Sequence, residues 1–170
     1  MKDRQWYAIY SKPRQEACAR DNLERQDYEV YLPMIKRKKR SRDKWIDVVE
    51  SLFPRYLFVR LTLFQDSFYS IRSTRGVSKI VQFGSDPVQV PVTLIDKLRA
   101  SESPGQEFID PARPLFSKGD ELTVTDGPFK GVSGIVQKNS GRERVIMLFN
   151  LLGRENKIVV KTNDVMLKSG

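Results

Sequence analysis

An apolar run at residues 53–61 places the strongest constraint on the fold, because it reads Phe-Pro-Arg-Tyr-Leu-Phe-Val-Arg-Leu within a polar chain. Side chains alternate between the two faces of a β-strand, so Tyr56 and Phe58 share one face. The opposite face carries only aliphatic residues: Leu57, Val59 and Leu61. A strand with large apolar side chains on both faces normally lies in the middle of a covered sheet. Alternatively, one of the two faces is a docking surface for a partner.

The positive charge of the chain is concentrated in its N-terminal part. The 170 residues include 30 Lys and Arg against 21 Asp and Glu, a net charge of +9. Residues 1–100 contribute +8 (20 basic, 12 acidic) and residues 101–170 contribute +1 (10 basic, 9 acidic). This excess favours an anionic partner such as nucleic acid or an acidic protein groove, although an inert basic surface is a common alternative.

Residue types that support metal binding and catalysis are scarce. One cysteine, Cys18, and no histidine exclude an intrachain disulfide, Cys/His zinc sites and His-dependent triads. The acidic pairs Asp27/Glu29 and Asp126/Glu143 form no recognisable motif for a metal-dependent nuclease. There is no apolar run near roughly 20 residues and no leading signal segment. We therefore expect a cytoplasmic, monomeric protein that is not an enzyme, needs no cofactor and contacts no membrane.

Residues 1–101 predict an α+β domain. Runs of aromatic and β-branched residues predict strands at 6–10, 29–35, 45–52, 53–63 and 79–83. Helices are expected at 14–26, 64–73 and 91–101. In the first helix, Ala19 and Leu23 are spaced i, i+4 and can face the sheet, and Ser11 is a candidate cap.

A dense basic run at residues 36–44 separates two of these strands. Such a run repels itself and is usually a mobile, solvated hairpin tip. The alternative is an arm that binds phosphates, and we favour this hypothesis, with Lys38 and Lys39 as contacts to nucleic acid.

The pattern changes after residue 101. Residues 102–113 contain Pro and Gly with little periodicity, which predicts a linker. In residues 114–170, glycines separate short runs that predict strands at 121–126, 135–136, 145–149 and 157–161, typical of a small antiparallel barrel. Met147, Leu148, Leu151 and Leu152 also fit a helical stripe, so a helix over 143–152 is as plausible as a strand.

Several motifs resemble the NusG family of transcription elongation factors. Its N-terminal domain is matched by Trp-Tyr-Ala-Ile-Tyr at 6–10, residues 52–59 and Thr-Arg-Gly-Val at 74–77. Lys-Gly-Asp at 118–120 followed by residues 126–131 resembles the KOW motif, which implies a five-stranded C-terminal barrel. Residues 22–26, 32–35, 51–54 and 150–152 resemble the RfaH subfamily of specialised antiterminators.

The resemblance implies a factor that binds RNA polymerase and the exposed non-template DNA strand, and suppresses pausing and termination. The clamp helices of polymerase would contact an aromatic patch of four residues: Tyr10, Phe53, Tyr56 and Phe58. The DNA strand would meet a polar group of four residues: Lys12, Gln26, Thr74 and Arg75. For the turn at 74–76, a plain solvated turn is the alternative. Ser67, Phe68 and Tyr69 stand where the subfamily has a His-Thr-Thr motif that contacts the polymerase gate loop. The Ser67 hydroxyl can make that contact, and the alternative is that Phe68 and Tyr69 are core residues.

The resemblance also implies a masked resting state. In the RfaH subfamily the C-terminal domain rests as an α-helical hairpin over the polymerase-binding patch, and Glu50 and Arg144 match its interdomain salt bridge. In that subfamily the domain, once released as a barrel, recruits ribosomal protein S10, for which Leu152 is the matching candidate; on residue pattern alone, a core leucine is the alternative. The alternatives are a general NusG-type factor that binds Rho, and a ribosome-associated RNA-binding protein with a KOW barrel.

Overall fold

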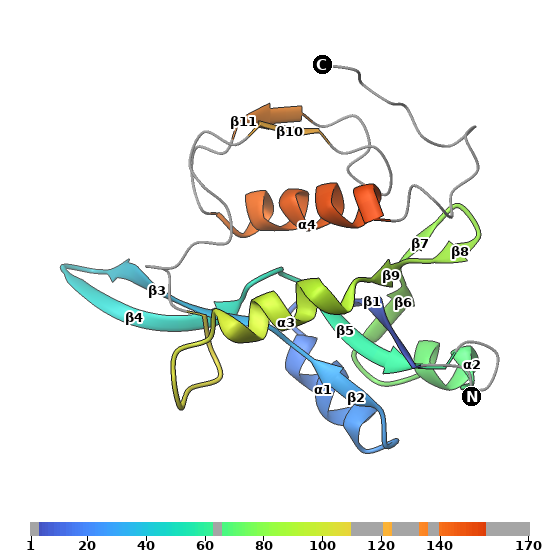
Figure 1. Cartoon of the computed structure of the whole chain (residues 1–170). Helices are drawn as coiled ribbons and strands as arrows, with labels where there is room; N and C mark the ends of the chain where they lie inside the picture. Colours follow the sequence, from blue (N-terminus) through green and yellow to red (C-terminus); the bar gives the residue numbers. More distant parts are fainter. Residues whose placement is uncertain (1–3, 63–65, 110–120, 124–132, 136–139, 156–170) are drawn as a thin grey trace.

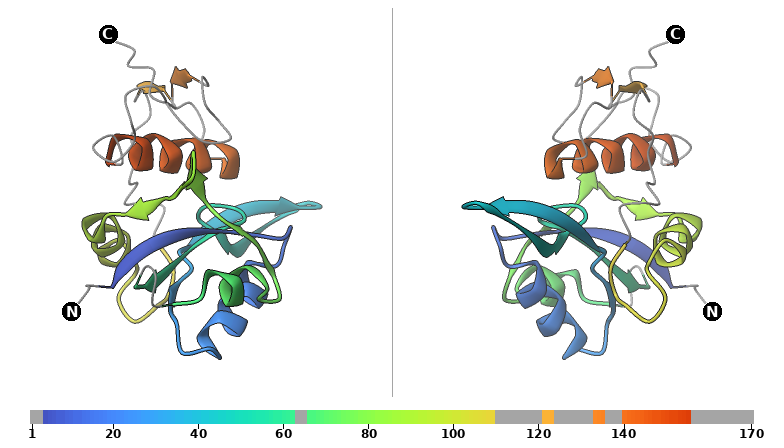
Figure 2. Two further views of the ribbon diagram at one scale, coloured as in Figure 1. Left: turned by 90° about the vertical axis from the view of Figure 1, so that its right-hand side faces the viewer. Right: turned by 90° about the vertical axis from the view of Figure 1, so that its left-hand side faces the viewer.

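The computed structural model describes residues 4–62, 66–109, 121–123, 133–135 and 140–155. A curved antiparallel sheet forms the middle layer. Two helices, α1 (Glu16–Glu24) and α2 (Phe68–Arg72), cover one face of this sheet. The opposite face is covered by α3 (Val92–Ala100) and α4 (Gly141–Glu155), as Figures 1 and 2 show. The expected mixed α+β fold is therefore observed.

The apolar run at residues 53–61 contributes β5 (Tyr56–Leu61), an interior strand of the sheet. It pairs antiparallel with β2 (Glu29–Tyr31) and β1 (Gln5–Ser11), and β1 also pairs with β6 (Val77–Ile80) and β9 (Gln89–Val90). Every residue of β5 except Arg60 is buried. The prediction of an interior strand covered on both faces is confirmed.

The first three helices lie within the predicted ranges, but the cap of α1 differs. Ser11 ends β1, and its hydroxyl donates to the Lys12 carbonyl at 3.0 Å, so the prediction that Ser11 caps α1 is wrong. A turn intervenes, in which Arg14 has a φ of +59° and the Gln15 N–H donates to the Lys12 carbonyl at 3.1 Å. The helix begins only after Gln15, because this turn carries the chain away from the end of the strand.

The basic run forms a long two-stranded hairpin that projects from the body of the molecule (Figure 1). Its strands are β3 (Met34–Ser41) and β4 (Lys44–Ser51), paired along their whole length. The strand predicted at 29–35 is broken between β2 and β3, because Pro33 has no N–H to donate to a ladder. A shorter hairpin of β7 (Gln82–Phe83) and β8 (Asp86–Pro87) lies beneath one end of α4.

The segment predicted as a linker is partly packed against the sheet domain. Residues 102–109 fold back so that Ile109 is only 2% exposed, and its N–H donates to the Met34 carbonyl at 2.8 Å. The Tyr31 hydroxyl donates to the Glu102 carboxylate at 2.6 Å. Burial and this carboxylate together raise the pKa of Tyr31 far above its ordinary value. The chain therefore remains attached to the sheet domain well beyond residue 101.

The C-terminal segment contains the main correction to the predicted elements. Residues 145–149 lie inside α4, so the strand predicted there is wrong for this structure, and the helical alternative holds. The reason is packing, because side chains at helical spacing bury one stripe against the sheet: Val145, Leu148, Phe149 and Leu152. The strands β10 (Glu121–Thr123) and β11 (Ser133–Ile135) form a separate antiparallel pair. The KOW-like residues and the strand expected at 157–161 lie outside the described residues, so the barrel stays a prediction.

The sheet separates two hydrophobic clusters. The cluster under α1 and α2 is largely aliphatic, whereas the cluster under α3 and α4 contains most of the buried aromatic rings. Of the helices in the described part of the chain, none is long and apolar enough to span a membrane.

Candidate functional site

The four residues of the aromatic patch come together at one end of β1 and β5. The Tyr10 and Tyr56 rings have centroids 4.9 Å apart, and the Phe53 and Phe58 rings lie 6.2 Å apart. Only Tyr10 is half-exposed, while the other three are 5% exposed or less. The patch exists as a contiguous surface, but in this structure it is covered.

The cover is α4. Its Phe149 ring meets the Tyr56 ring edge-on at 5.2 Å and the Phe83 ring at 6.0 Å. Leu152, the expected ribosome contact, is fully buried in the same interface. Burial raises the pKa of the Tyr56 hydroxyl well above its ordinary value. A partner could reach Tyr56 and Phe58 only after α4 has moved away.

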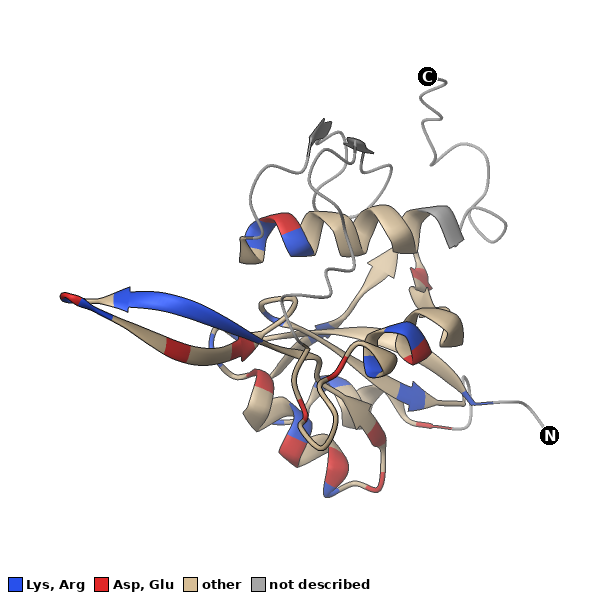
Figure 3. Ribbon diagram, turned by 60° about the vertical axis from the view of Figure 1, so that its left-hand side comes forward, with Lys and Arg blue, Asp and Glu red and all other residues tan. Residues whose placement is uncertain are grey.

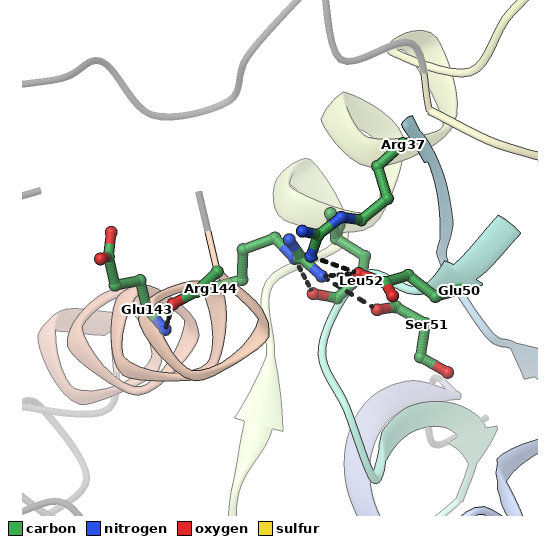
Figure 4. Close-up of polar contacts among 7 residues, drawn as sticks. Arg37, Glu50, Ser51, Leu52, Glu143 and Arg144 are labelled. Carbon is green, nitrogen blue, oxygen red and sulfur yellow. Dashed lines mark hydrogen bonds and ion pairs between the residues drawn. The ribbon is translucent and has the colours of Figure 1, made fainter. Parts of the chain in front are cut away.

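A buried arginine fastens the N-terminal end of α4 to the hairpin base (Figure 4). Arg144 is 2% exposed, and its Nη2 donates to the Glu50 carboxylate at 2.9 Å. Its Nε donates to the Leu52 carbonyl at 2.6 Å, and its Nη2 also reaches the Ser51 carbonyl at 3.4 Å. The structure thus brings together Glu50 and Arg144, the two residues expected to form an interdomain pair.

Glu50 receives a second arginine from its own hairpin. Arg37 donates to the same carboxylate oxygen at 3.1 Å. Burial by itself would raise the pKa of Glu50, but the hydrogen bonds from Arg144 and Arg37 outweigh it and lower the pKa below its ordinary value. The carboxylate is therefore held in its charged form, as a pair with a buried guanidinium requires.

The residues of the polar group also gather, at the end of β1, the end of α1 and the turn before β6. The Gln26 side-chain amide donates to the Thr74 hydroxyl at 2.7 Å, and that hydroxyl donates to the Ser70 carbonyl at 2.7 Å. Thr74 is 6% exposed, whereas Lys12, Gln26 and Arg75 face solvent. Thr74 therefore positions Gln26, and the accessible members are Lys12, Gln26 and Arg75.

Gly76 allows this turn to lie close to α1. It has a φ of +90°, and a Cβ at this position would lie 2.6 Å from the Ala19 nitrogen. Its carbonyl accepts from the Lys12 N–H at 2.8 Å. The glycine in the Thr-Arg-Gly-Val motif is required by both conformation and space, and it fixes Lys12 beside Arg75.

Arg55 contacts Tyr10 of the aromatic patch and the end of β1 next to Lys12, and no sequence motif pointed to this role. Its guanidinium carbon lies 3.9 Å from the Tyr10 ring centroid, and its Nε donates to the Ser11 carbonyl at 3.1 Å. Its backbone N–H donates to Glu16 at 2.9 Å. Arg55 adopts a φ of +72°, in the left-handed region that favours glycine. In the sequence, Pro54 indicates a turn at this point, but a proline does not indicate that the next residue adopts a positive φ.

The remaining predicted residues lie elsewhere. Lys38 and Lys39 are exposed on the projecting hairpin (Figure 3). Ser67 caps α2 by accepting from the Ser70 N–H at 3.2 Å, Phe68 packs against the aliphatic cluster, and Tyr69 is 81% exposed. Among the described residues, no three His, Cys, Asp or Glu side chains are grouped so that they could hold a metal ion.

Comparison with known proteins identifies the family to which this chain belongs. Residues 4–99 match the family model described as transcription termination factor nusG, which spans more than half of the chain. The chain belongs to the NusG family. The predicted closeness to the RfaH subfamily is a finer statement and stays a prediction.

Curated relatives align along nearly the whole chain, and each bears the description transcription termination/antitermination protein NusG. The Thermus thermophilus protein is 28% identical, covering 95% of this chain and 97% of the relative. The Bacillus subtilis protein is 24% identical, covering 96% and 98%. The Streptomyces griseus protein is 25% identical, and the alignment spans 95% of this chain but 63% of that longer relative. A solved structure titled "Domain interaction in Thermotoga maritima NusG" is 20% identical, with a TM-score of 0.47, covering 79% of this chain and 80% of that one.

Proposed function

We propose that this chain is a transcription elongation and antitermination factor that binds RNA polymerase through Tyr10, Phe53, Tyr56 and Phe58. The names of its relatives support a role in transcription termination and antitermination. The observation that carries the proposal is the aromatic patch itself, which is contiguous and is covered by a helix from the far end of the chain. Clustered aromatic side chains are the usual anchors of protein interfaces.

The resting protein is masked in this proposal. The sheet domain (1–101) binds polymerase, residues 102–113 link it to the C-terminal domain (114–170), and α4 blocks the patch until it is displaced. The buried Arg144 and its bond to Glu50 support a specific closed state. After release, the C-terminal domain becomes a barrel in which Leu152 is free to contact ribosomal protein S10.

The exposed members of the polar group bind the non-template DNA strand. Lys12 and Arg75 supply cations for phosphates, Gln26 reads a base edge, and Thr74 holds Gln26 in place. Lys38 and Lys39 add affinity that does not depend on sequence.

A general NusG-type factor, with Rho as the partner of its C-terminal domain, is the second candidate. The relatives' common name favours it. Recruitment to polymerase on scaffolds with randomised non-template DNA separates the two, because a specialised factor enriches one DNA element and a general factor enriches none.

The experiment that tests the proposal measures binding of the full chain to core polymerase. Phe149→Ala removes a ring from the cover and should strengthen binding, because less free energy is needed to expose the patch. Tyr56→Ala combined with Phe149→Ala should abolish that gain. Arg142→Ala, an exposed position on α4, is the matched control and should behave as the unaltered chain. Unchanged binding in Phe149→Ala would count against a masked polymerase site.

A further inference from the structure

The hairpin of β3 and β4 has two chemically different faces. Residues directly opposite each other on antiparallel strands project to the same face. The register pairs Arg40 with Trp45 and Lys38 with Asp47, so these four residues share one face. Lys39 is paired with Ile46, which places both on the opposite face. Lys38 and Lys39, although adjacent in sequence, therefore project to opposite faces of the hairpin.

Trp45 is an unusual residue to leave exposed. Its side chain is 68% exposed near the tip of the hairpin. Two other aromatic rings each carry an arginine: Arg99 lies 5.3 Å from the Trp6 ring, and Arg55 lies 3.9 Å from the Tyr10 ring. Among the described residues no cation or second ring stacks on Trp45. A free indole face of this kind can accept a planar group.

Lys38 and Arg40, which share the face of Trp45, are not neutralised by ion pairs within the described residues. Residues 34–51 carry seven Lys or Arg and three Asp or Glu. Asp47 is paired with Lys36 at 3.4 Å, and Glu50 is held by Arg37 and Arg144. The third acid, Asp43, lies in the turn. Within the described residues, neither Lys38 nor Arg40 forms an ion pair. Most of β3 is coloured for Lys and Arg in Figure 3, and the register places Lys38 and Arg40 on the same face as Trp45.

We propose that Lys38, Arg40 and Trp45 form a stacking face for single-stranded DNA, with one unpaired base on the Trp45 indole and flanking phosphates on Lys38 and Arg40. Charge complementarity selects a polyanion over an apolar protein surface. The open indole selects unpaired bases over a duplex, whose base faces are hidden in the stack. This inference rests on the proposed role in transcription and adds a second DNA contact, separate from Lys12 and Arg75.

The fluorescence of the full chain tests the proposal directly. Trp45 is exposed, whereas the only other tryptophan, Trp6, is 3% exposed, so quenching by an added oligonucleotide reports on Trp45. A thymine oligonucleotide of about ten nucleotides should quench the emission of the unaltered chain. With the same oligonucleotide carrying a fluorescent label, the anisotropy of the label should show that Trp45→Ala weakens binding about tenfold. Ile46→Ala is the matched control on the opposite face and should change binding less than about twofold. Equal losses in the two variants would overturn the proposal.

Three further comparisons narrow the assignment. Lys38→Gln should weaken single-strand binding more than Lys39→Gln, because only Lys38 shares the face of Trp45. For a duplex of the same length, Trp45→Ala should have no effect. A Trp45-dependent loss on duplex, equal losses for the two lysine variants, or a clear preference for RNA of the same sequence would each overturn the assignment to unpaired DNA.

The proposed role in transcription and the stacking face are tested by different measurements, so one can fail without the other. Lys12→Ala and Arg75→Ala should reduce recruitment to polymerase scaffolds without changing the quenching of Trp45. Quenching without any recruitment would leave the stacking face intact and remove the transcription role.

Discussion

The two faces of the sheet are covered in opposite ways. The face under α1 and α2 is closed by helices adjacent in sequence to the strands they cover, through aliphatic side chains such as Leu23 and Ile71. The face under α4 is closed by a segment that follows β5 by about eighty residues, through aromatic rings and a buried arginine. One strand, β5, supplies Leu57 to the first face and Tyr56 to the second.

This difference separates a core from an interface. Aliphatic side chains packed by neighbouring segments form the part of the fold that cannot open without unfolding the sheet. An aromatic surface under a distant helix can be uncovered while the sheet remains folded. The comparison therefore predicts that substitutions on the two faces have different consequences for the whole molecule.

The largest effect is expected on the aliphatic face. Leu57 is fully buried, and Leu57→Ala should lower the free energy of unfolding by about 4 kcal/mol, since it removes methyl groups and leaves a cavity. Denaturant titration should show loss of the whole sheet domain in one transition. Val92→Ala, at a 54% exposed position, is the control and should change stability by no more than about 0.5 kcal/mol. Loss of structure confined to α1 would contradict the idea that the aliphatic face forms the cooperative core of the sheet domain.

Phe149→Ala on the other face should destabilise the cover and spare the sheet. The loss is expected to be about 3 kcal/mol for the docking of α4, because the ring fills space against Tyr56 and Phe83. Amide hydrogen exchange should accelerate in α4 while the amides of β1 and β5 keep their protection. Equal acceleration in α4 and β5 would show that α4 belongs to the same cooperative core.

Alternation along β5 was sufficient to predict two buried faces, and the periodicity of Ala19 and Leu23 was sufficient to place α1. The alternation along β5 could not decide whether Tyr56 and Phe58 are core residues or a docking surface. That question depends on a helix far along the chain, and residues 145–149 fit a strand and a helix equally well. Tertiary packing selected the helix here.

Sequence motifs predicted those residues of the candidate site that match the family pattern, and they missed the others. The pairing of Glu50 with Arg144 came from family resemblance, because nothing local links two residues so far apart. Arg55 was missed because a positive φ at a non-glycine residue leaves no sequence signature. The hydrogen bond from Gln26 to Thr74 was missed because it joins a helix end to a turn 48 residues later.

Gly141 offers a way to lift one end of the cover. A Cβ there would lie 2.8 Å from the Pro54 ring, so Gly141→Val should cost about 2 kcal/mol in α4 docking. The helical signal in circular dichroism should fall, and the melting temperature of the sheet domain should not. Arg142→Ala, exposed one residue later, is the control. An unchanged helical signal would mean that the contact with Pro54 relaxes without moving α4.

The smallest effect is expected at the ion pair, and it depends on pH. The pKa of Glu50 in the folded protein lies below its ordinary value of 4.5, so the unfolded or uncovered state binds a proton more readily. The stabilisation from the pair is therefore complete above that ordinary value, and is lost as the pH falls through the lowered pKa of the closed state. Because Glu50 is 39% exposed, solvent screening limits the effect to about 1 kcal/mol or less.

Glu50→Gln isolates this contribution from the other carboxylates. Acidification from about pH 7 to about pH 3 should weaken α4 docking in the unaltered chain, measured by hydrogen exchange of the α4 amides. In Glu50→Gln the docking should already be weaker at neutral pH, and the additional loss on acidification should be smaller. Arg144 still donates to the Leu52 carbonyl in this variant, so α4 should remain largely docked. Complete release of α4 would show that the ion pair, and not the aromatic interface, holds the cover closed.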